Sequence, residues 1–303
     1  MSSLKTLAFA GAVAVVATSA ALSSSALAAD LMPPPMIAPP PPPMVGGSGG
    51  LYLRGDIGVG TLSADDLDLR LNGQAVAAGS LGYTSVNKKS SSGDSAFFVG
   101  AGIGYQFNSF LRFDATIERR SGNLHGSDAL TYVNGGITTN QTNNHSVNMT
   151  SYVGLLNGYI DLGTWNCLTP YVGAGIGFAN NRFANYTDNG IQQVGAGAPG
   201  TSFAYAAPAS KTNLAWALMA GVAYDVNPNL KLELGYRYLN MGDGPVMALA
   251  GANGVLANPS YSVGYKTIDS HDLKIGMRWM FNDPNCCGPS APQMASAPLI
   301  RKY

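Results

Sequence analysis

Residues 230–238 read Leu-Lys-Leu-Glu-Leu-Gly-Tyr-Arg-Tyr, and residues 272–279 read Asp-Leu-Lys-Ile-Gly-Met-Arg-Trp. In both stretches, apolar or aromatic side chains alternate with charged residues or glycine. This period of two predicts a β-strand, because successive side chains of a strand point to opposite faces of the sheet. Both stretches are close to the length of about ten residues with which a tilted strand crosses a bilayer. The two segments therefore favour strands that pass through a membrane.

Six further segments alternate in the same way, so the sequence predicts eight strands in all. These segments are residues 51–60, 97–107, 110–119, 150–162, 170–179 and 214–226. The pattern is least clean in the fourth of the eight, and Val-Gly-Ala-Gly-Ile-Gly occurs twice, at 99–104 and at 172–177. Neither copy has the glycine spacing of a nucleotide-binding loop. Small residues that make room across a narrow barrel explain the two copies better.

The connections between these segments alternate between short and long. Short connections are predicted at 108–109, 163–169 and 227–229, and long ones at about 61–96, 120–149, 180–213 and 239–271. Tight periplasmic turns and longer external loops are typical of outer-membrane barrels. The sequence thus predicts an all-β fold, an eight-stranded antiparallel transmembrane up-and-down β-barrel with short periplasmic turns and four long extracellular loops.

Alternation alone also fits a soluble β-sandwich, which would bury the apolar face and expose the polar one. The charges help to separate the two folds. The polar faces of the predicted strands carry six cations and seven anions: Arg54, Arg112, Lys231, Arg237, Lys274 and Arg278 against Asp56, Asp114, Glu118, Asp161, Asp225, Glu233 and Asp272. Because an unpaired charge in a narrow lumen is costly, this near balance predicts a barrel interior lined by paired charges.

The first residues predict export. Lys5 precedes an apolar run from Leu7 to about Leu22, and Ala26-Leu27-Ala28 offers a cleavage site, so residues 1–28 are interpreted as a signal peptide. An uncleaved membrane anchor is the alternative. We then expect a proline-rich periplasmic leader at 29–50, the barrel at 51–281 and a periplasmic tail at 282–303. The leader is interpreted as a stiff spacer, or alternatively as a segment that binds periplasmic partners.

Composition narrows the range of partners. The chain has 303 residues, with 17 basic and 17 acidic side chains and only 11% charged residues. A chain without net charge has no field that draws it to nucleic acid, so we expect no nucleic-acid partner. No cofactor motif is present. Outer-membrane lipid and lipopolysaccharide are the expected surroundings of such a barrel.

Three cysteines, Cys167, Cys286 and Cys287, fall on the expected periplasmic side. The periplasm permits disulfides. The hypothesis is that Cys167 pairs with Cys286 or with Cys287, which would hold the tail under the barrel. Adjacent cysteines rarely bridge each other, because the ring would be strained.

The last predicted strand ends in aromatic residues, Trp279 and Phe281. This ending resembles the C-terminal signal by which the barrel assembly machinery recognises its substrates. The chain departs from the usual pattern because 22 residues follow Phe281 and Tyr303 is its last residue. Either the assembly machinery recognises an internal signal at Phe281, or the aromatic end of the tail contributes to recognition.

Three stretches carry a family resemblance: residues 170–177, 232–238 and 271–278. They resemble the small outer-membrane β-barrel family of α-proteobacteria, often called opacity-type porins, whose architecture is related to the OmpA transmembrane domain. The resemblance covers about residues 51–281. It implies an abundant surface protein in the outer membrane of a Gram-negative bacterium, structural or weakly porin-like, with no catalytic residues.

The expected function is therefore that of a structural outer-membrane barrel with at most weak small-solute porin activity, and not that of an enzyme. The alternative is recognition of host or phage surfaces by external loops such as Thr138 to Asn144. A further alternative is lipid A hydrolysis, because His125-Gly126-Ser127 resembles the His-x-Ser spacing of the lipid A deacylase barrels. A metal shared by His125 and His145 is disfavoured by the lack of a fixed local spacing.

Overall fold

The computed structural model describes residues 49–251 and 261–281, which form one antiparallel sheet without helices. No helix in these residues is long and apolar enough to cross a membrane. The predicted signal peptide, most of the predicted leader and the predicted tail lie outside the described residues. The strands are β1 (Gly50–Leu71), β2 (Gln74–Ala75), β3 (Tyr83–Gln106), β4 (Leu111–Asn134), β5 (Ile137–Asp161), β6 (Leu168–Val194), β7 (Gly200–Ala206), β8 (Ala209–Asn227), β9 (Leu230–Asn240), β10 (Met247–Gly251) and β11 (Tyr261–Met280).

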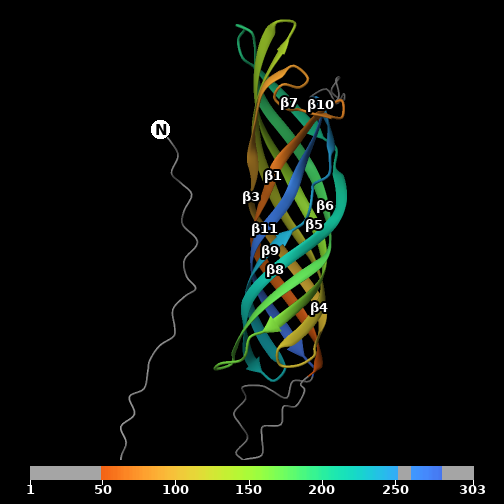
Figure 1. Cartoon of the computed structure of the whole chain (residues 1–303), viewed down its shortest axis with the longest axis vertical. Helices are drawn as coiled ribbons and strands as arrows, with labels where there is room; N and C mark the ends of the chain where they lie inside the picture. Colours follow the sequence, from red (N-terminus) through yellow and green to blue (C-terminus); the bar gives the residue numbers. More distant parts are fainter. Residues whose placement is uncertain (1–48, 252–260, 282–303) are drawn as a thin grey trace, which may run out of the picture. The chain divides into compact units, whose positions relative to one another are not determined.

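Eight of the described strands close into a ring, in the order β1, β3, β4, β5, β6, β8, β9 and β11 (Figure 1). The ring closes where β11 pairs with β1, with Ile57 opposite Ile275 and Leu71 opposite Tyr261. Closure gives every strand of the ring two partners, which satisfies the backbone without water, as a bilayer requires. The predicted eight-stranded antiparallel barrel is confirmed.

Two of the three short connections at one end of the barrel, the turn end, are set by asparagine side chains. Asn108 Oδ1 accepts hydrogen bonds from the backbone N–H groups of Phe110 (3.0 Å) and Leu111 (2.8 Å). Asn227 Oδ1 does the same for Asn229 and Leu230, both at 2.9 Å. An asparagine in this position reproduces a backbone turn and starts the next strand within two or three residues.

The segments expected to be long loops differ from that expectation, because most of their residues continue as strands. β4 and β5 run on for 24 and 25 residues and are joined only by Gly135 and Gly136. Both glycines have positive φ angles, 57° and 78°, which a side chain rarely adopts. β7 and β10 pair with each other and lie between β6 and β11 at this extended end (Figure 1).

The long strands cross two zones of opposite polarity. In the lower zone, side chains such as Ile117 and Leu156 point outward and are 61% and 66% exposed. In the upper zone, Leu124 and Met149 point inward and are buried, while polar residues point outward. The lower zone, the apolar band, comprises residues 51–60, 97–120, 151–179, 214–238 and 271–281. The upper zone, the extension, comprises residues 61–96, 121–150, 180–213, 239–251 and 261–270. An alternation with its polar face outward is typical of water-exposed sheets. The apolar outward pattern of lipid-facing strands therefore ends at the edge of the band, although the strands continue.

Inward glycines make room for large side chains of neighbouring strands. A Cβ atom at Gly104 would overlap the ring of Tyr52, and one at Gly102 would lie 2.6 Å from the backbone oxygen of Ala115. Tyr52 is wholly buried and donates a hydrogen bond to Asp114 (3.0 Å). The glycine run of β3 therefore accommodates the contents of the lumen.

Replacing Gly104 with leucine should lower the free energy of unfolding by at least about 1–3 kcal/mol, because Tyr52 would have to leave its place in a packed interior. Urea unfolding of the refolded protein in lipid vesicles measures the change. Gly55→Leu is the matched control, since a Cβ atom at Gly55 meets nothing within 4 Å. Equal stability of the two variants would show that the lumen around Tyr52 is loosely filled.

Candidate functional site

Four charged side chains form a buried quartet in the upper part of the apolar band. Arg237 of β9 makes a two-pronged ion pair with Glu118 of β4, at 2.8 Å and 3.0 Å. Arg237 also contacts Asp272 of β11 at 2.7 Å, and Arg120 reaches the same carboxylate at 2.7 Å. Arg120 lies 3.3 Å from Glu118 and completes the quartet. Two cations and two anions thus link three strands across the lumen.

A phenylalanine ring fills the space beside this quartet. Phe98 of β3 is wholly buried, and the guanidinium groups of Arg120 and Arg237 lie 5.1 Å and 4.9 Å from its centroid. Guanidinium groups at this distance are attracted to the electron-rich face of an aromatic ring. The two cations of the quartet thus share one aromatic ring, which β3 supplies.

A second buried cluster lies nearer the turn end and is centred on Glu233 of β9. Its carboxylate contacts Arg54 (3.2 Å), Arg112 (3.3 Å) and Arg278 (3.4 Å). Arg54 and Arg278 are directly opposite each other on β1 and β11, so their like charges would repel without an anion between them. Glu233 supplies that anion, and Arg54 is also held by Asp114 at 2.7 Å.

The remaining charges of the band extend this cluster toward the walls of the barrel. Arg54 pairs with Asp56 at 2.8 Å, Lys274 approaches Asp56 at 3.7 Å, Arg112 pairs with Asp161 at 3.1 Å and Lys231 pairs with Asp225 at 3.0 Å. The guanidinium of Arg112 is stacked on the ring of Tyr159, 4.0 Å from its centroid. Ion pairs and stacked rings therefore occupy the cross-section of the lumen.

The structure places every residue of the predicted interior charge set on the inner face, and all of them are buried. These residues are Arg54, Asp56, Arg112, Asp114, Glu118, Asp161, Asp225, Lys231, Glu233, Arg237, Asp272, Lys274 and Arg278. Sequence reasoning missed Arg120, because the third strand was ended at Arg119. Continuing the alternation from Glu118 by one step would have found it. With Arg120 included, seven cations match seven anions on the inner face of the described part of the apolar band, whereas Arg119 points outward.

A layer of apolar side chains covers the charges on the side of the extension. Leu62, Leu124, Met149, Phe183 and Ile268 all point inward there and are at most 1% exposed. Such a layer excludes water and strengthens the ion pairs beneath it, because charges interact more strongly at low dielectric. The lumen is therefore filled by charge pairs in the band and by an apolar core above them.

Two of the three histidines lie on the outer face of the barrel, and the third lies inside it. His125 on β4 is exposed, with Nε2 3.2 Å from Asp94, whereas His145 on β5 is buried inside the extension. Because they lie on opposite sides of the wall, these two histidines do not share a metal site. His271 points outward and Nδ1 lies 2.6 Å from the Tyr236 hydroxyl. Among the described side chains, no hydrogen bond joins His125 to Ser127.

The other predicted residues lie at the turn end. Trp279 and Phe281 point outward and are 46% and 52% exposed; through β1 they are in register with Ile103 and Tyr105 of β3. Aromatic side chains at this level are typical of the girdle at a membrane surface. Cys167 lies beside the β5–β6 turn, whereas Cys286 and Cys287 are outside the described residues, so the disulfide stays a prediction.

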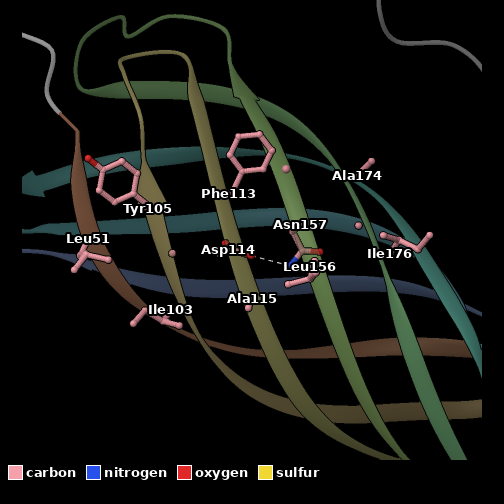
Figure 2. A pocket seen from close by; sticks show the side chains of 13 residues that line it. Leu51, Ile103, Tyr105, Phe113, Asp114, Ala115, Leu156, Asn157, Ala174 and Ile176 are labelled. Carbon is pink, nitrogen blue, oxygen red and sulfur yellow. Dashed lines mark hydrogen bonds between the residues drawn. The ribbon is translucent and has the colours of Figure 1, made fainter.

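An apolar groove of about 770 Å³ runs along the outer face of the band near the turn end. Figure 2 shows Ile103, Phe113, Leu156 and Ile176 around the small side chains Ala115 and Ala174. The dashed line marks the hydrogen bond from Asn157 to Asp114 (2.8 Å), which belongs to the interior network. The groove faces outward among apolar side chains, where lipid tails rather than a polar ligand would fill it.

The chain matches a known protein family and several known proteins in part. The family description "Outer membrane protein beta-barrel domain" matches residues 14–281. An uncharacterised protein of Brucella abortus is 34% identical over 151 residues, 48% of this chain and 51% of that protein, so the chain spans about half the length of this curated relative. A Rickettsia prowazekii protein described as a candidate adhesin is 27% identical over 184 residues, 60% of this chain and 72% of that protein. The crystal structure of the outer membrane protein OprG from Pseudomonas aeruginosa is 15% identical, covers 78% of this chain and 98% of that chain, and has a TM-score of 0.44.

Proposed function

The chain belongs to the outer membrane protein β-barrel family, and from that premise we propose that it is a closed structural barrel with a recognition surface outside the cell. It is an outer-membrane protein. The balanced set of buried charges in the apolar band is the observation that carries the first half of the proposal. Charges buried in a filled lumen must be matched and paired, because an unpaired buried charge is costly, whereas a conducting pore keeps its charges in water.

Weak small-solute passage is the most that such a lumen supports. The interior of an eight-stranded barrel is only wide enough for side chains to fill. Here the wholly buried side chains include Tyr52, Tyr159, Arg112 and Arg278, which are among the largest side chains available. Conduction would need these side chains to move, and their ion pairs and stacked rings oppose that movement.

The extension supports the second half of the proposal. Its outer face is polar, with Asn140, Thr142, Asn144 and Asn148 exposed along β5. The strands carry this face beyond the apolar band, where a macromolecule can reach it, and external parts of barrels commonly carry binding functions. The Rickettsia relative described as a candidate adhesin favours host surfaces, and phage surfaces offer a comparable partner.

Shortening the β4–β5 hairpin should reduce cell or phage attachment to background while the barrel still folds. Asp128 and Asn143 are directly paired, so replacing residues 129–142 with Asn-Gly joins them through a tight turn. Attachment of bacteria displaying each variant to cultured cells and to phage measures the effect. A second variant shortens the β6–β7 hairpin in the same way. There Asn-Gly replaces residues 193–199, since Gln192 and Gly200 are paired. Unchanged attachment in both variants would contradict recognition by the extension.

The proposal assigns no catalytic step to the barrel. It includes outer-membrane lipid and lipopolysaccharide as neighbours of the apolar band, because the outward side chains there are predominantly apolar. It also includes the barrel assembly machinery as a transient partner, which would recognise Trp279 and Phe281.

A further inference from the structure

The interior of the extension contains a cavity of about 310 Å³ near the end that bears β7 and β10. Residues of β1, β3, β4, β5, β6, β7, β10 and β11 contribute to its wall. Its volume is at the lower end of the range for pockets that bind small molecules. The apolar layer that includes Leu124 and Met149 separates it from the charged clusters of the band.

Aromatic rings form much of the cavity wall. The rings of Tyr83, Tyr132 and Tyr261 line it, together with aliphatic side chains such as Leu130. The rings of Tyr83 and Tyr132 are 5.4 Å apart, and the hydroxyls of Tyr83 and Tyr261 are hydrogen-bonded at 3.2 Å. These contacts hold the rings in place and pair two of the hydroxyl groups with each other.

Asp188 of β6 is the one charged residue among the described side chains that line the cavity. It is 9% exposed, and its Oδ1 atom has no hydrogen-bond partner among the described residues. The nearest cationic candidate, His145 Nδ1, lies 3.7 Å away and is hydrogen-bonded to the Tyr186 hydroxyl at 2.6 Å. The other ring nitrogen of His145 contacts Asp128. The carboxylate of Asp188 is therefore buried without a hydrogen bond on Oδ1.

The charge around Asp188 is negative in either state of the histidine. Two carboxylates, Asp128 and Asp188, share one imidazole, so one negative charge remains even when His145 is protonated. Burial raises the pKa of Asp188 to about 6, which leaves this carboxylate ionised at neutral pH. A buried negative charge of this kind favours a cationic ligand and repels anions.

We propose that this cavity binds a small organic ammonium ion, with its charge near Asp188 and its carbon substituents against Tyr83 and Tyr132. A neutral apolar molecule would leave the carboxylate unpaired. A hydrated inorganic cation would demand more oxygen ligands than one free carboxylate supplies. An alkylammonium ion satisfies both the carboxylate and the aromatic wall, because diffuse positive charge is attracted to ring faces. This binding does not require the extension to attach to any macromolecule.

Binding of choline to the full-length protein tests the proposal, with 3,3-dimethylbutanol as the neutral analogue of nearly the same shape. Saturation-transfer NMR titrations in a sugar-headed detergent give both affinities without competition from a choline headgroup. We expect choline to bind at least about tenfold more tightly than the alcohol, the effect of one favourable charge contact. Equal affinities, or no binding of choline, would overturn the proposal.

Two variants separate the contributions of charge and aromatic wall. Asp188→Asn should weaken choline by about tenfold or more and leave the alcohol unchanged, whereas Asp65→Asn on the outer face of β1 should change neither. Tyr132→Leu should weaken choline more than the alcohol. Retained alcohol binding shows that a variant still forms the cavity. If Asp188→Asn keeps full choline affinity, the carboxylate does not recognise the cation.

Lowering the pH provides a second readout on the unmodified protein. Choline affinity should fall as the pH drops from about 8 to about 5, because Asp188 gains a proton near pH 6. The groups that face Asp188 are His145 of β5, Asp128 of β4, Tyr186 of its own strand and Tyr265 of β11. Affinity that is independent of pH over this range would count against the proposed site.

Discussion

Replacing Arg237 with glutamate should abolish the folded barrel. Arg237 pairs with both Glu118 and Asp272 in the buried quartet, so the substitution would set three carboxylates against Arg120 alone. The repulsion acts in an interior where all four groups are at most 8% exposed, so water cannot screen it. The measurement is migration on a gel without boiling, because a folded outer-membrane barrel shifts only when it is heated.

Arg237→Lys is the matched control for this substitution. Lysine keeps the positive charge but loses the two-pronged contact with Glu118, so the barrel should still fold, with an unfolding free energy lower by about 1–3 kcal/mol. If Arg237→Glu folds and shifts on heating like the unmodified protein, the quartet must be solvated. A solvated quartet would contradict a filled lumen.

Replacing Glu233 with glutamine should lower the free energy of unfolding by about 3–5 kcal/mol, the usual cost of removing one partner from a buried ion pair. Glu233 contacts three arginines, and among the described residues it is the ion-pair partner of Arg278. Arg54 and Arg278, which are opposite each other across β1 and β11, would then face each other without the anion between them. Urea unfolding in lipid vesicles, followed by tryptophan fluorescence, measures the loss.

The control for this substitution removes a carboxylate of equal charge from an exposed hydrogen bond. Asp94 pairs with His125 on the outer face, where the two side chains are 65% and 48% exposed. Asp94→Asn should change the unfolding free energy by no more than about 0.5 kcal/mol, because exposed pairs contribute little. A similar, small effect of both substitutions would mean that water reaches Glu233.

The sequence predicted the apolar band because lipid imposes a simple rule on every strand that crosses it. Apolar outward side chains recur at every second residue, and the charged residues between them must then point into the lumen. This rule was sufficient to place Arg54, Glu233 and Arg237 on one inner surface. It did not identify which charges meet, because Arg54 and Glu233 are 179 residues apart in the chain and meet only through ring closure.

The strands of the extension were not predicted, because the solvent around them differs from that around the band. Above the band the solvent changes from lipid to water, so the polarity of the two faces is reversed while the strands continue. Leu124 and Met149 lie inside, whereas Asn140 and Asn148 lie outside. These segments are rich in polar residues and glycine and lack the apolar outward pattern of lipid-facing strands, so the sequence predicts loops there. The cavity with Asp188 could not be foreseen either, because its wall combines eight strands.

The electrical conductance of the unmodified protein in a planar bilayer tests the central claim most directly. A lumen filled by matched charge pairs and covered by an apolar layer should leave the bilayer silent, or produce steps no larger than about a tenth of those of a wide porin with about 16 strands. Stable steps of the size that a wide, water-filled porin gives would contradict the account, because such a current requires an open path through the quartet and the cluster around Glu233.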